Sequence, residues 1–412
     1  MEIRPIISAM LRSKTGAILI AAQIALTLGI LCNALYIVRD RLELADRPSG
    51  AAEDEVFVLS VSPFRKVDDV KGMQLEDEAA LRRIPGVKAV TWTNQVPLGQ
   101  SSSNTGFATR RDQSPDSTIV ATTYTGPDSF VDALGLKLVE GRDLNANDVI
   151  EVGPETAEFI PRSAIVTQAF AKKMYPDAAS ALGKQLFYST GDKAKVSTIV
   201  GVVERLQTPA AQANPASEGK GEYSVIYPVR ELDQYTLYLV RTEPGERARV
   251  IAAAEKVLSE RMEGRVLLPT RTLNELRERR YRADHALAGM LISVMVLLLL
   301  VTASGIVGMA SLWVNQRRKQ IGVRRALGAR RWDILRYFLT ENLLVTTTGI
   351  FGGIVLALAL NWLLVNELEL ARLPMGYLAA GAGMLWLLGL LAVYGPAWKA
   401  ASISPAIATR SA

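Results

Sequence analysis

Four long segments of the sequence are rich in apolar residues and contain no Asp, Glu, Lys or Arg. A helix needs about 20 apolar residues to cross the hydrocarbon core of a bilayer. Each segment is longer than that, so the pattern predicts a membrane protein with four transmembrane α-helices. The uncharged segments are Thr15 to Val38, Ala286 to Gln316, Asn342 to Asn366 and Leu373 to Trp398.

The loop between the second and third apolar segments is strongly basic. From Gln316 to Glu341 it carries eight Lys or Arg residues, with Asp333 as the one acid before Glu341. Short loops rich in Lys and Arg stay in the cytoplasm, and the basic flanks before Thr15 and after Trp398 agree. We therefore expect both termini in the cytoplasm and the long segment after the first helix outside the cell membrane.

These expectations give an organisation by residue number. The predicted parts are a cytoplasmic interfacial helix at 1–14, transmembrane helices at 15–38, 285–316, 334–366 and 373–398, an extracytoplasmic domain at 39–284, a cytoplasmic loop at 317–333, a short outer loop at 367–372 and a cytoplasmic tail at 399–412. A secretory signal is the rival explanation of the first apolar segment. That segment exceeds the apolar region of a signal, and no small-residue cleavage site follows it.

The extracytoplasmic segment shows the order strand, helix, strand twice. The predicted elements are Glu55–Val61, Glu76–Ile84 and Val87–Gln95 in the first copy, and Gln234–Thr242, Arg247–Met262 and Arg265–Pro269 in the second. Two such units predict an α+β domain of split β-α-β type. The residues between them predict an inserted second lobe, with strands near Thr118–Thr125, Ala164–Val166 and Val196–Val203.

The cytoplasmic loop has its own helical signals. Ile321 to Leu327 favours a helix, Gly328 stands where a helix C-cap is favoured, and a second helix is expected from near Arg331. Val323, Ala326 and Leu327 share one face of the short helix and Arg317, Gln320 and Arg324 another. One face is suited to a partner protein. The alternative is that the arginines only set the topology and bind anionic lipid headgroups.

The order Gln320-Ile-Gly-Val-Arg-Arg-Ala-Leu-Gly-Ala329, followed by Asp333-Ile334 and Glu341, resembles the signature of MacB/FtsX-type ABC transporter permeases. The family motif usually opens with Arg-Glu, and Gln320 replaces that acid here. The resemblance implies that this segment is a coupling helix that docks on a cytoplasmic ATPase. The coupling residues it implies are Arg317, Arg318, Gln320, Ile321, Gly322, Val323, Arg324, Arg325, Ala326, Leu327, Gly328 and Ala329.

The resemblance extends over most of the chain. Pro127 to Asp143, Ile199 to Val203 and the tail from Pro396 to Pro405 are similar to further family motifs. The family implies a separate ABC ATPase that binds ATP and Mg, a second permease copy or homologue, and for MacB-like members a periplasmic adaptor and an outer-membrane channel. It implies no cofactor on this chain itself. An FtsX-like regulator of a cell-wall hydrolase, a Lol-like lipoprotein extraction permease and an ATP-independent receptor are the competing functions.

Residues with catalytic chemistry are scarce. His285 is the one histidine and Cys32 the one cysteine, and the sequence has no G-x-x-x-x-G-K-[ST] phosphate loop. These counts argue against an enzyme and against a thiolate metal site. The net charge of +6 is concentrated in the cytoplasmic parts, so it reports membrane orientation and contact with lipid and does not indicate nucleic-acid binding.

Small and polar residues predict how the helices pack and act. Gly349 and Gly353, with Gly352, and Gly381 with Gly383 are expected to let membrane helices approach closely, and Gln23 and Asn33 to face other helices. No proline occurs from Leu273 to Gln320, which predicts one continuous helix that exceeds the membrane thickness. Arg142-Asp143 is expected to be a solvated pair. The polar loops Ser101–Asn104 and Thr208–Gly221 are candidate contacts for an outer partner.

Overall fold

The computed structural model describes residues 14–100, 102–153, 160–209, 221–261, 263–368 and 372–402. The chain divides into a helical unit, Met1–Leu44 with Asp284–Ala412, and a β-rich unit, Ala45–Ala283. Several predicted segments lie outside the described residues. They are the interfacial helix apart from Lys14, the residue Ser101, most of the loop Thr208–Gly221, part of the outer loop at 367–372, and the tail beyond Ser402.

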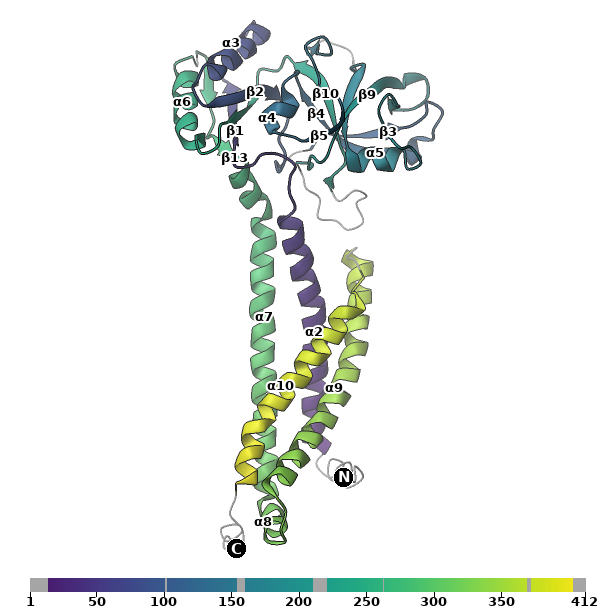
Figure 1. Cartoon of the computed structure of the whole chain (residues 1–412), viewed down its shortest axis with the longest axis vertical. Coiled ribbons are helices and arrows are strands. Elements are labelled where there is room, and N and C mark those ends of the chain that lie inside the picture. Colours follow the sequence, from purple (N-terminus) through teal and green to yellow (C-terminus); the bar gives the residue numbers. More distant parts are fainter. Residues whose placement is uncertain are drawn as a thin grey trace. The chain divides into compact units, whose positions relative to one another are not determined.

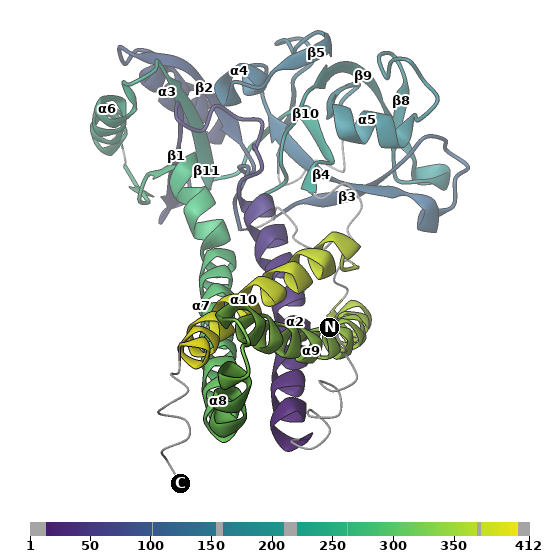
Figure 2. The same ribbon diagram turned by 60° about the horizontal axis from the view of Figure 1, so that its bottom comes forward.

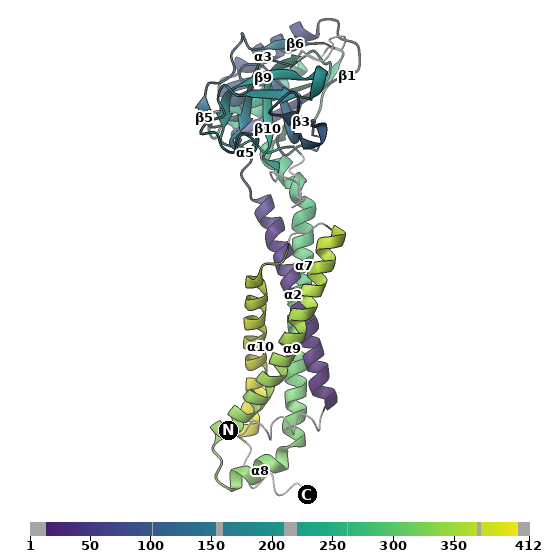
Figure 3. The same ribbon diagram turned by 90° about the vertical axis from the view of Figure 1, so that its right-hand side faces the viewer.

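Four helices in the described residues are long and apolar enough to cross a membrane. They are α2 (Lys14–Ala45), α7 (Leu273–Gln316), α9 (Arg331–Leu368) and α10 (Met375–Ala401). The short helix α8 (Arg318–Ala326) lies between α7 and α9 (Figure 1). Within the helical unit, α9 and α10 pack side by side and α8 lies at the ends of α7 and α9 (Figure 3). The predicted fold class is thus confirmed for the membrane part.

Helix α2 carries much of the core of the helical unit. Ile24 and Leu28 are buried in one apolar cluster that also contains residues of α7, α9 and α10. Polar side chains join the helices as well: Thr27 and Thr302 share a hydrogen bond of 2.8 Å, and Asn33 Nδ2 donates to the carbonyl of Ala357 at 3.1 Å. The prediction that Asn33 faces another helix is confirmed.

Glycines on α9 and α10 allow the backbones to approach α2. A Cβ at Gly349 would come within 2.8 Å of Ile24, one at Gly353 within 2.7 Å of Leu28, and one at Gly381 within 2.7 Å of Cys32. These three glycines therefore pack inside one chain. No described atom lies within 4 Å of a Cβ at Gly383, so the expectation of close packing is not met there.

The proline-free helix expected from Leu273 to Gln320 ends earlier. Helix α7 stops at Gln316, and Arg317 leaves helical geometry, with φ −103° and ψ 11°, to become the N-cap of α8. The backbone N–H of Arg317 still donates to the carbonyl of Trp313 at 3.1 Å, while its side chain is paired with Glu341 of α9. The 44 residues of α7 still extend about 66 Å at 1.5 Å per residue, against about 30 Å for a bilayer core.

The first lobe of the β-rich unit contains the two predicted strand-helix-strand copies. Its elements are β1 (Val56–Pro63), α3 (Val70–Arg82), β2 (Val87–Thr93), β11 (Thr236–Thr242), α6 (Arg247–Ser259) and β12 (Arg265–Leu267). They share one sheet in the order β12-β1-β11-β2, and β13 (Arg271–Thr272) also pairs with β1. Helix α3 begins six residues before the predicted Glu76, because the Asp69 carboxylate accepts from the N–H of Gly72 and caps it.

Strand β1 is buried on both faces, which explains its nearly continuous apolar sequence. Phe57, Leu59 and Val61 pack against α3 and α6, whereas Val56 and Val58 belong to the core shared with the second lobe. That core includes Phe130 and Leu134 of α4 (Phe130–Leu134). The two lobes of the β-rich unit are therefore joined by one apolar interface.

The second lobe is a closed barrel. Strand pairing follows the order β4-β3-β8-β9-β7-β10 and returns from β10 to β4, and closure leaves no unpaired edge in that ring. Helix α5 (Gln168–Met174) packs beside it (Figure 2). The strands are β3 (Asn104–Ala108), β4 (Ile119–Gly126), β7 (Ser163–Thr167), β8 (Gln185–Tyr188), β9 (Lys195–Val203) and β10 (Ser224–Glu231), with β5 (Leu138–Gly141) and β6 (Ile150–Val152) added at its side.

Sequence reasoning found three strands of this barrel, β4, β7 and β9, and missed the others. The missed strands β3 and β8 of the barrel, and β5 and β6 at its side, are only three to five residues long, too short to show a clear alternation. Strand β10 was missed for a different reason. It contains Pro228 inside an eight-residue strand, and proline weakens a strand prediction.

Arg142 and Asp143 are not a pair, contrary to the expectation. Arg142 forms two hydrogen bonds with the carboxylate of Asp148, at 2.7 and 3.0 Å, and these hold the pKa of Asp148 at about 2. Asp143 is partly buried near the acids Asp132 and Asp128, and burial first and those charges second raise its pKa to about 6. The charged form of Asp143 is therefore disfavoured in the folded state.

We predict that Gly353→Ala destabilises the helical unit and that Gly383→Ala does not. The new methyl at 353 would meet Leu28 at 2.7 Å, and such overpacking costs about 1–3 kcal/mol. Residue 383 has open space, and replacing a helical glycine by alanine favours the helix by about 1 kcal/mol. Thermal unfolding of both variants in one detergent tests this. A midpoint of Gly353→Ala at or above that of the wild type would contradict it.

We also predict that Asp143→Asn becomes more stabilising as the pH rises from about 4 to about 6. The folded-state pKa of Asp143, about 6, lies above its usual value. The protonated side chain therefore contributes to the free energy of unfolding in full below the pKa of the unfolded state, and this contribution is lost as the pH rises through 6. An asparagine does not titrate, so the stability of the variant does not change with pH through this position. Unfolding midpoints of wild type and variant should diverge over this range and run parallel above it, and a constant difference would contradict the prediction.

Candidate functional site

Helix α8 is closed at its C-terminal end by backbone hydrogen bonds. The N–H of Ala329 donates to the carbonyl of Arg324 at 3.0 Å, and that of Gly328 to Arg325 at 3.2 Å. Gly328 has φ +98°, which a glycine adopts without strain. Together these are a Schellman motif, and they confirm the predicted end at Gly328.

Helix α9 starts directly after this turn. The Asp333 carboxylate accepts from the backbone N–H of Arg330 at 2.9 Å, and the N–H of Asp333 donates to the carbonyl of Arg330 at 3.1 Å. A carboxylate in the first turn satisfies a backbone donor and complements the helix dipole. The helix predicted from near Arg331 is confirmed, and the turn between α8 and α9 is defined at both ends.

One side of α8 is seated on the helical unit. Ile321 is 5% exposed and Gly322 is buried. Ile321 belongs to the same apolar cluster as Ile334 and Phe338 of α9 and as three alanines near the end of α10, Ala397, Ala400 and Ala401. Small side chains at these positions allow close approach, so the α10 motif supplies a seat for α8 that sequence reasoning did not foresee.

The other side of α8 is exposed and apolar at its centre. Val323 is 52% exposed and Leu327 84%, and Trp332 in the first turn of α9 is 63% exposed. Exposed large apolar side chains beside a basic segment mark an interaction surface more often than chance. Between Arg318 and Asp333, the exposed charged and polar residues are Arg318, Lys319, Gln320, Arg324, Arg330, Arg331 and Asp333.

Arg317 does not belong to this exposed face, although its sequence position put it beside Gln320 and Arg324. Its Nη1 lies 2.8 Å from Oε2 of Glu341 and donates to the hydroxyl of Tyr337 at 3.2 Å. Glu341 is 1% exposed. Arg317 lines one small pocket together with Gln320 and Arg324, the residues expected on its face of the helix, and its permanently charged guanidinium is paired with a buried carboxylate.

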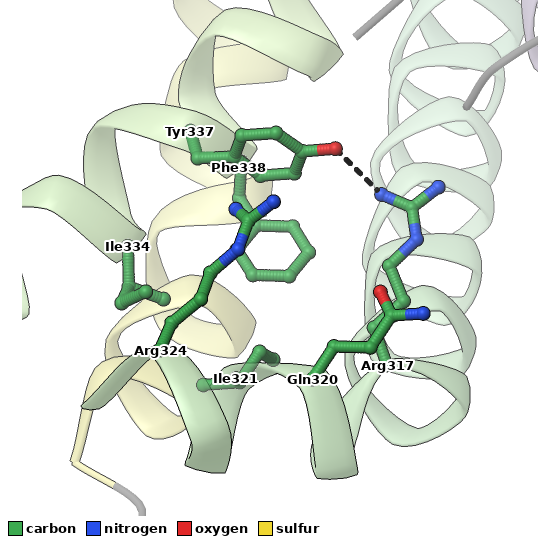
Figure 4. Close-up of a pocket in the computed structure, with 7 residues that line it drawn as sticks. All are labelled: Arg317, Gln320, Ile321, Arg324, Ile334, Tyr337 and Phe338. Carbon is green, nitrogen blue, oxygen red and sulfur yellow. Dashed lines mark hydrogen bonds between the residues drawn. The ribbon is translucent and has the colours of Figure 1, made fainter. Parts of the chain in front are cut away.

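The ring of Tyr337 lies between two guanidinium groups. Arg324 Cζ is 5.4 Å and Arg317 Cζ 6.0 Å from its centroid, which is within the range of cation-π attraction. Figure 4 shows the guanidinium of Arg324 next to the Tyr337 ring and that of Arg317 beyond the Tyr337 hydroxyl, with Gln320 and Ile321 below. The pocket between them, about 30 Å³, has room for a water molecule.

The structure thus separates the predicted coupling residues into groups. Ile321 and Gly322 lie on the buried side of α8. Arg317 is paired with Glu341 of α9, and Gly328 and Ala329 form the turn after α8. The remaining predicted residues, Arg318, Gln320, Val323, Arg324, Arg325, Ala326 and Leu327, are exposed or partly exposed. Sequence reasoning missed Tyr337 and Trp332, and it did not connect Glu341 with Arg317. Their aromatic and acidic character within an otherwise basic segment was the available signal.

An arginine in the first turns of α7 makes several contacts within the β-rich unit. Arg277 contacts both carboxylate oxygens of Glu53, at 2.6 and 2.7 Å, and donates to the carbonyls of Ala45 and Arg47. Burial alone would raise the pKa of Glu53, but hydrogen bonds from Arg277 and Ser49 lower it below its ordinary value. Arg277 therefore ties Ala45, the last residue of α2, and the turn that precedes β1 to α7.

Tyr281, one turn further along α7, is also fixed in the β-rich unit. Its hydroxyl accepts from Gln207 Nε2 at 3.1 Å, and the backbone N–H of Gln207 donates to the carbonyl of Ser49 at 2.8 Å. The carbonyl of Gln207 accepts from the Tyr124 hydroxyl of β4. One buried residue thus connects α7, the segment after α2 and the barrel.

Two protein-family descriptions match the chain, one over most of the β-rich unit and one over the helices that include α8. The description "MacB-like periplasmic core domain" fits residues 23–257, more than half of the chain, and "FtsX-like permease C-terminal" fits residues 292–405. The first match covers most of the β-rich unit. The second covers more than half of α7 and all of α8, α9 and α10.

Two relatives are export proteins by name. The pyoverdine export ATP-binding/permease protein of Pseudomonas syringae pv. tomato is 37% identical over 131 residues, which are 32% of this chain and 20% of that protein. The macrolide export ATP-binding/permease protein MacB of Agrobacterium fabrum is 28% identical over 287 residues, which are 67% of this chain and 41% of that protein. The chain therefore spans less than half the length of these relatives.

Among solved structures, the periplasmic region of MacB from Actinobacillus actinomycetemcomitans aligns with a TM-score of 0.31 and 13% identity, over 55% of this chain and 93% of that one. The extracellular domain of the ABC-type transporter YknZ aligns with a TM-score of 0.31 and 14% identity, over 52% and 100%. With a family match over more than half of its residues and export permeases among its relatives, the chain belongs to the MacB-type, FtsX-like ABC transporter permeases.

Proposed function

We propose that this permease receives the work of ATP hydrolysis from a separate ABC ATPase at α8 and passes it through α7 to the β-rich unit. The observation that carries the proposal is the exposed face of α8, where Val323 and Leu327 lie in a basic segment beside Trp332. Apolar anchors with a charged rim are the anatomy of a protein interface. The partner expected from this chemistry has an apolar groove with an acidic rim.

In this proposal ATP and Mg bind to the partner and no cofactor binds to the permease. The two basic ends and the basic α8 segment lie in the cytoplasm of a bacterium, in its inner membrane, and the β-rich unit lies in the periplasm. The exposed residues Arg318 and Lys319 at the start of α8 meet anionic lipid or the acidic rim. Gln320, which replaces the usual family acid, adds no charge to the contact.

The internal construction of the chain suits mechanical transmission. Helix α7 is continuous over 44 residues, and its end in the β-rich unit is held by Arg277 and Tyr281. A continuous helix transmits displacement along its axis because every backbone hydrogen bond lies within it. Two permease copies or homologues, each with its own ATPase contact, would move two β-rich units together.

Export is the direction that the relatives support. Proteins named for pyoverdine export and for macrolide export match this chain, and we extend export, without a substrate, to this permease. A periplasmic adaptor and an outer-membrane channel complete the proposed path. The size of the β-rich unit, Ala45–Ala283, favours this over an FtsX-like regulator, whose outer domain is expected to be much smaller.

We predict that Leu327→Asp abolishes copurification of the ATPase. Leu327 is 84% exposed, so the substitution leaves the fold intact, whereas a buried charge at the centre of an interface typically costs 2 kcal/mol or more. The matched control is Leu182→Asp, which changes an exposed leucine of the β-rich unit. Mild detergent purification followed by mass spectrometry tests both. Normal ATPase recovery with Leu327→Asp would refute docking at α8.

We also predict that Arg279→Pro uncouples the β-rich unit from nucleotide while leaving the ATPase bound. Residue 279 lies inside α7, where a proline removes a backbone hydrogen bond and kinks the helix; Arg279→Ala is the control that changes the side chain alone. Hydrogen exchange in residues 45–283, compared with and without ATP, gives the readout. Equal ATP-dependent changes in the proline variant and the wild type would exclude transmission through α7.

A further inference from the structure

The turn between α7 and α8 is held by one side chain that points inward. Arg317 is the N-cap of α8 and forms no side-chain cap of its own. Its guanidinium instead reaches α9, where Glu341 Oε2 lies 2.8 Å from Nη1 and the Tyr337 hydroxyl 3.2 Å. Its side chain is 17% exposed and that of Glu341 1%. The direction in which α8 leaves α7 therefore depends on this ion pair.

The ion pair and the apolar seat of α8 act at different points of the short helix. Ile321 anchors its middle in the cluster with Ile334 and Phe338. Gly322 is buried next to it, and three alanines of α10 belong to the same cluster, so apolar contacts hold the middle of α8. The Arg317–Glu341 contact fixes a second point, and two points determine the orientation of the exposed Val323 and Leu327.

Buried polar atoms near Glu341 are not all satisfied. In the part of the chain that the structure describes, Glu341 Oε1, Asn342 Nδ2 and Thr346 Oγ1 are buried without a hydrogen-bond partner. A Cβ at Gly389 of α10 would lie 3.0 Å from both the Asn342 and the Thr346 atom. Native structures contain few such atoms, and a buried acceptor left free on Glu341 allows the carboxylate to accept a second donor when α8 shifts.

We propose that the Arg317–Glu341 ion pair is a positioning latch for the coupling helix. It holds the α7–α8 turn on α9, so that a load applied to α8 is delivered to α7 and α9 together. This inference rests on the proposed function for the source of the load. The orientation of α8 that it assigns to the ion pair does not depend on any partner.

The test measures the orientation of α8 in the full-length chain in nanodiscs. Spin labels are placed at Lys319→Cys on α8 and Thr348→Cys on α9, both exposed positions, and the buried native Cys32 is checked for lack of labelling. The wild type should give one narrow distance distribution. Glu341→Gln and Arg317→Met should shift or broaden the distance distribution. Arg317→Lys keeps the charge and should give a distribution close to that of the wild type. The matched control is Arg336→Met, an exposed arginine of α9, which should leave it unchanged.

A second measurement reports on coupling. With the copurified ATPase, Glu341→Gln should reduce the permease-dependent stimulation of ATP hydrolysis by at least about fivefold, the lower end for coupled sites, without loss of ATPase binding. A Glu341→Gln variant that is monodisperse and has the wild-type distance distribution would overturn the latch. If no ATPase responds to the wild type, the proposed function fails, and the distance distributions alone still decide the latch.

Discussion

A guanidinium group that cannot lose its proton must have acceptors wherever the fold withdraws it from water, and one such group lies at or near each end of α7. Arg317 finds Glu341 on α9, and Arg277 finds Glu53 together with the carbonyls of Ala45 and Arg47. Removing one partner of a buried ion pair typically costs about 3–5 kcal/mol, because the other charge stays buried and unpaired. These two ion pairs therefore fix the positions at which the two ends of α7 contact neighbouring segments.

The membrane helices themselves are held together mainly by close packing of their side chains and backbones. Helix α2 lies against glycines of α9 and α10, and the missing side chains at Gly349, Gly353 and Gly381 are what allow the approach. Lipid offers no hydrophobic driving force between helices, so close packing and a few polar contacts must supply the association. The Thr27–Thr302 and Asn33–Ala357 hydrogen bonds provide such contacts.

The cytoplasmic segment divides its residues between support and contact. Ile321, Gly322, Arg317 and Glu341 face the other helices, and the Schellman turn at Gly328 closes the helix. What remains outside is a small apolar face with a basic rim. This division explains how nine residues can hold a defined orientation, since a helix of that length is not stable by itself in water and depends on its tertiary contacts.

Local pattern alone determined the four membrane helices, the strand-helix-strand copies and the end of α8 at Gly328. Each depends on signals within one segment: uncharged length, alternation and the conformational freedom of glycine. Closure of the barrel by β10 and β4 was decided only by the tertiary structure, and so were the inward turn of Arg317 and the pairing of Arg142 with Asp148 instead of Asp143. These depend on residues brought together from separate elements, and a side chain selects its partner by distance and burial, which spacing along the sequence does not contain.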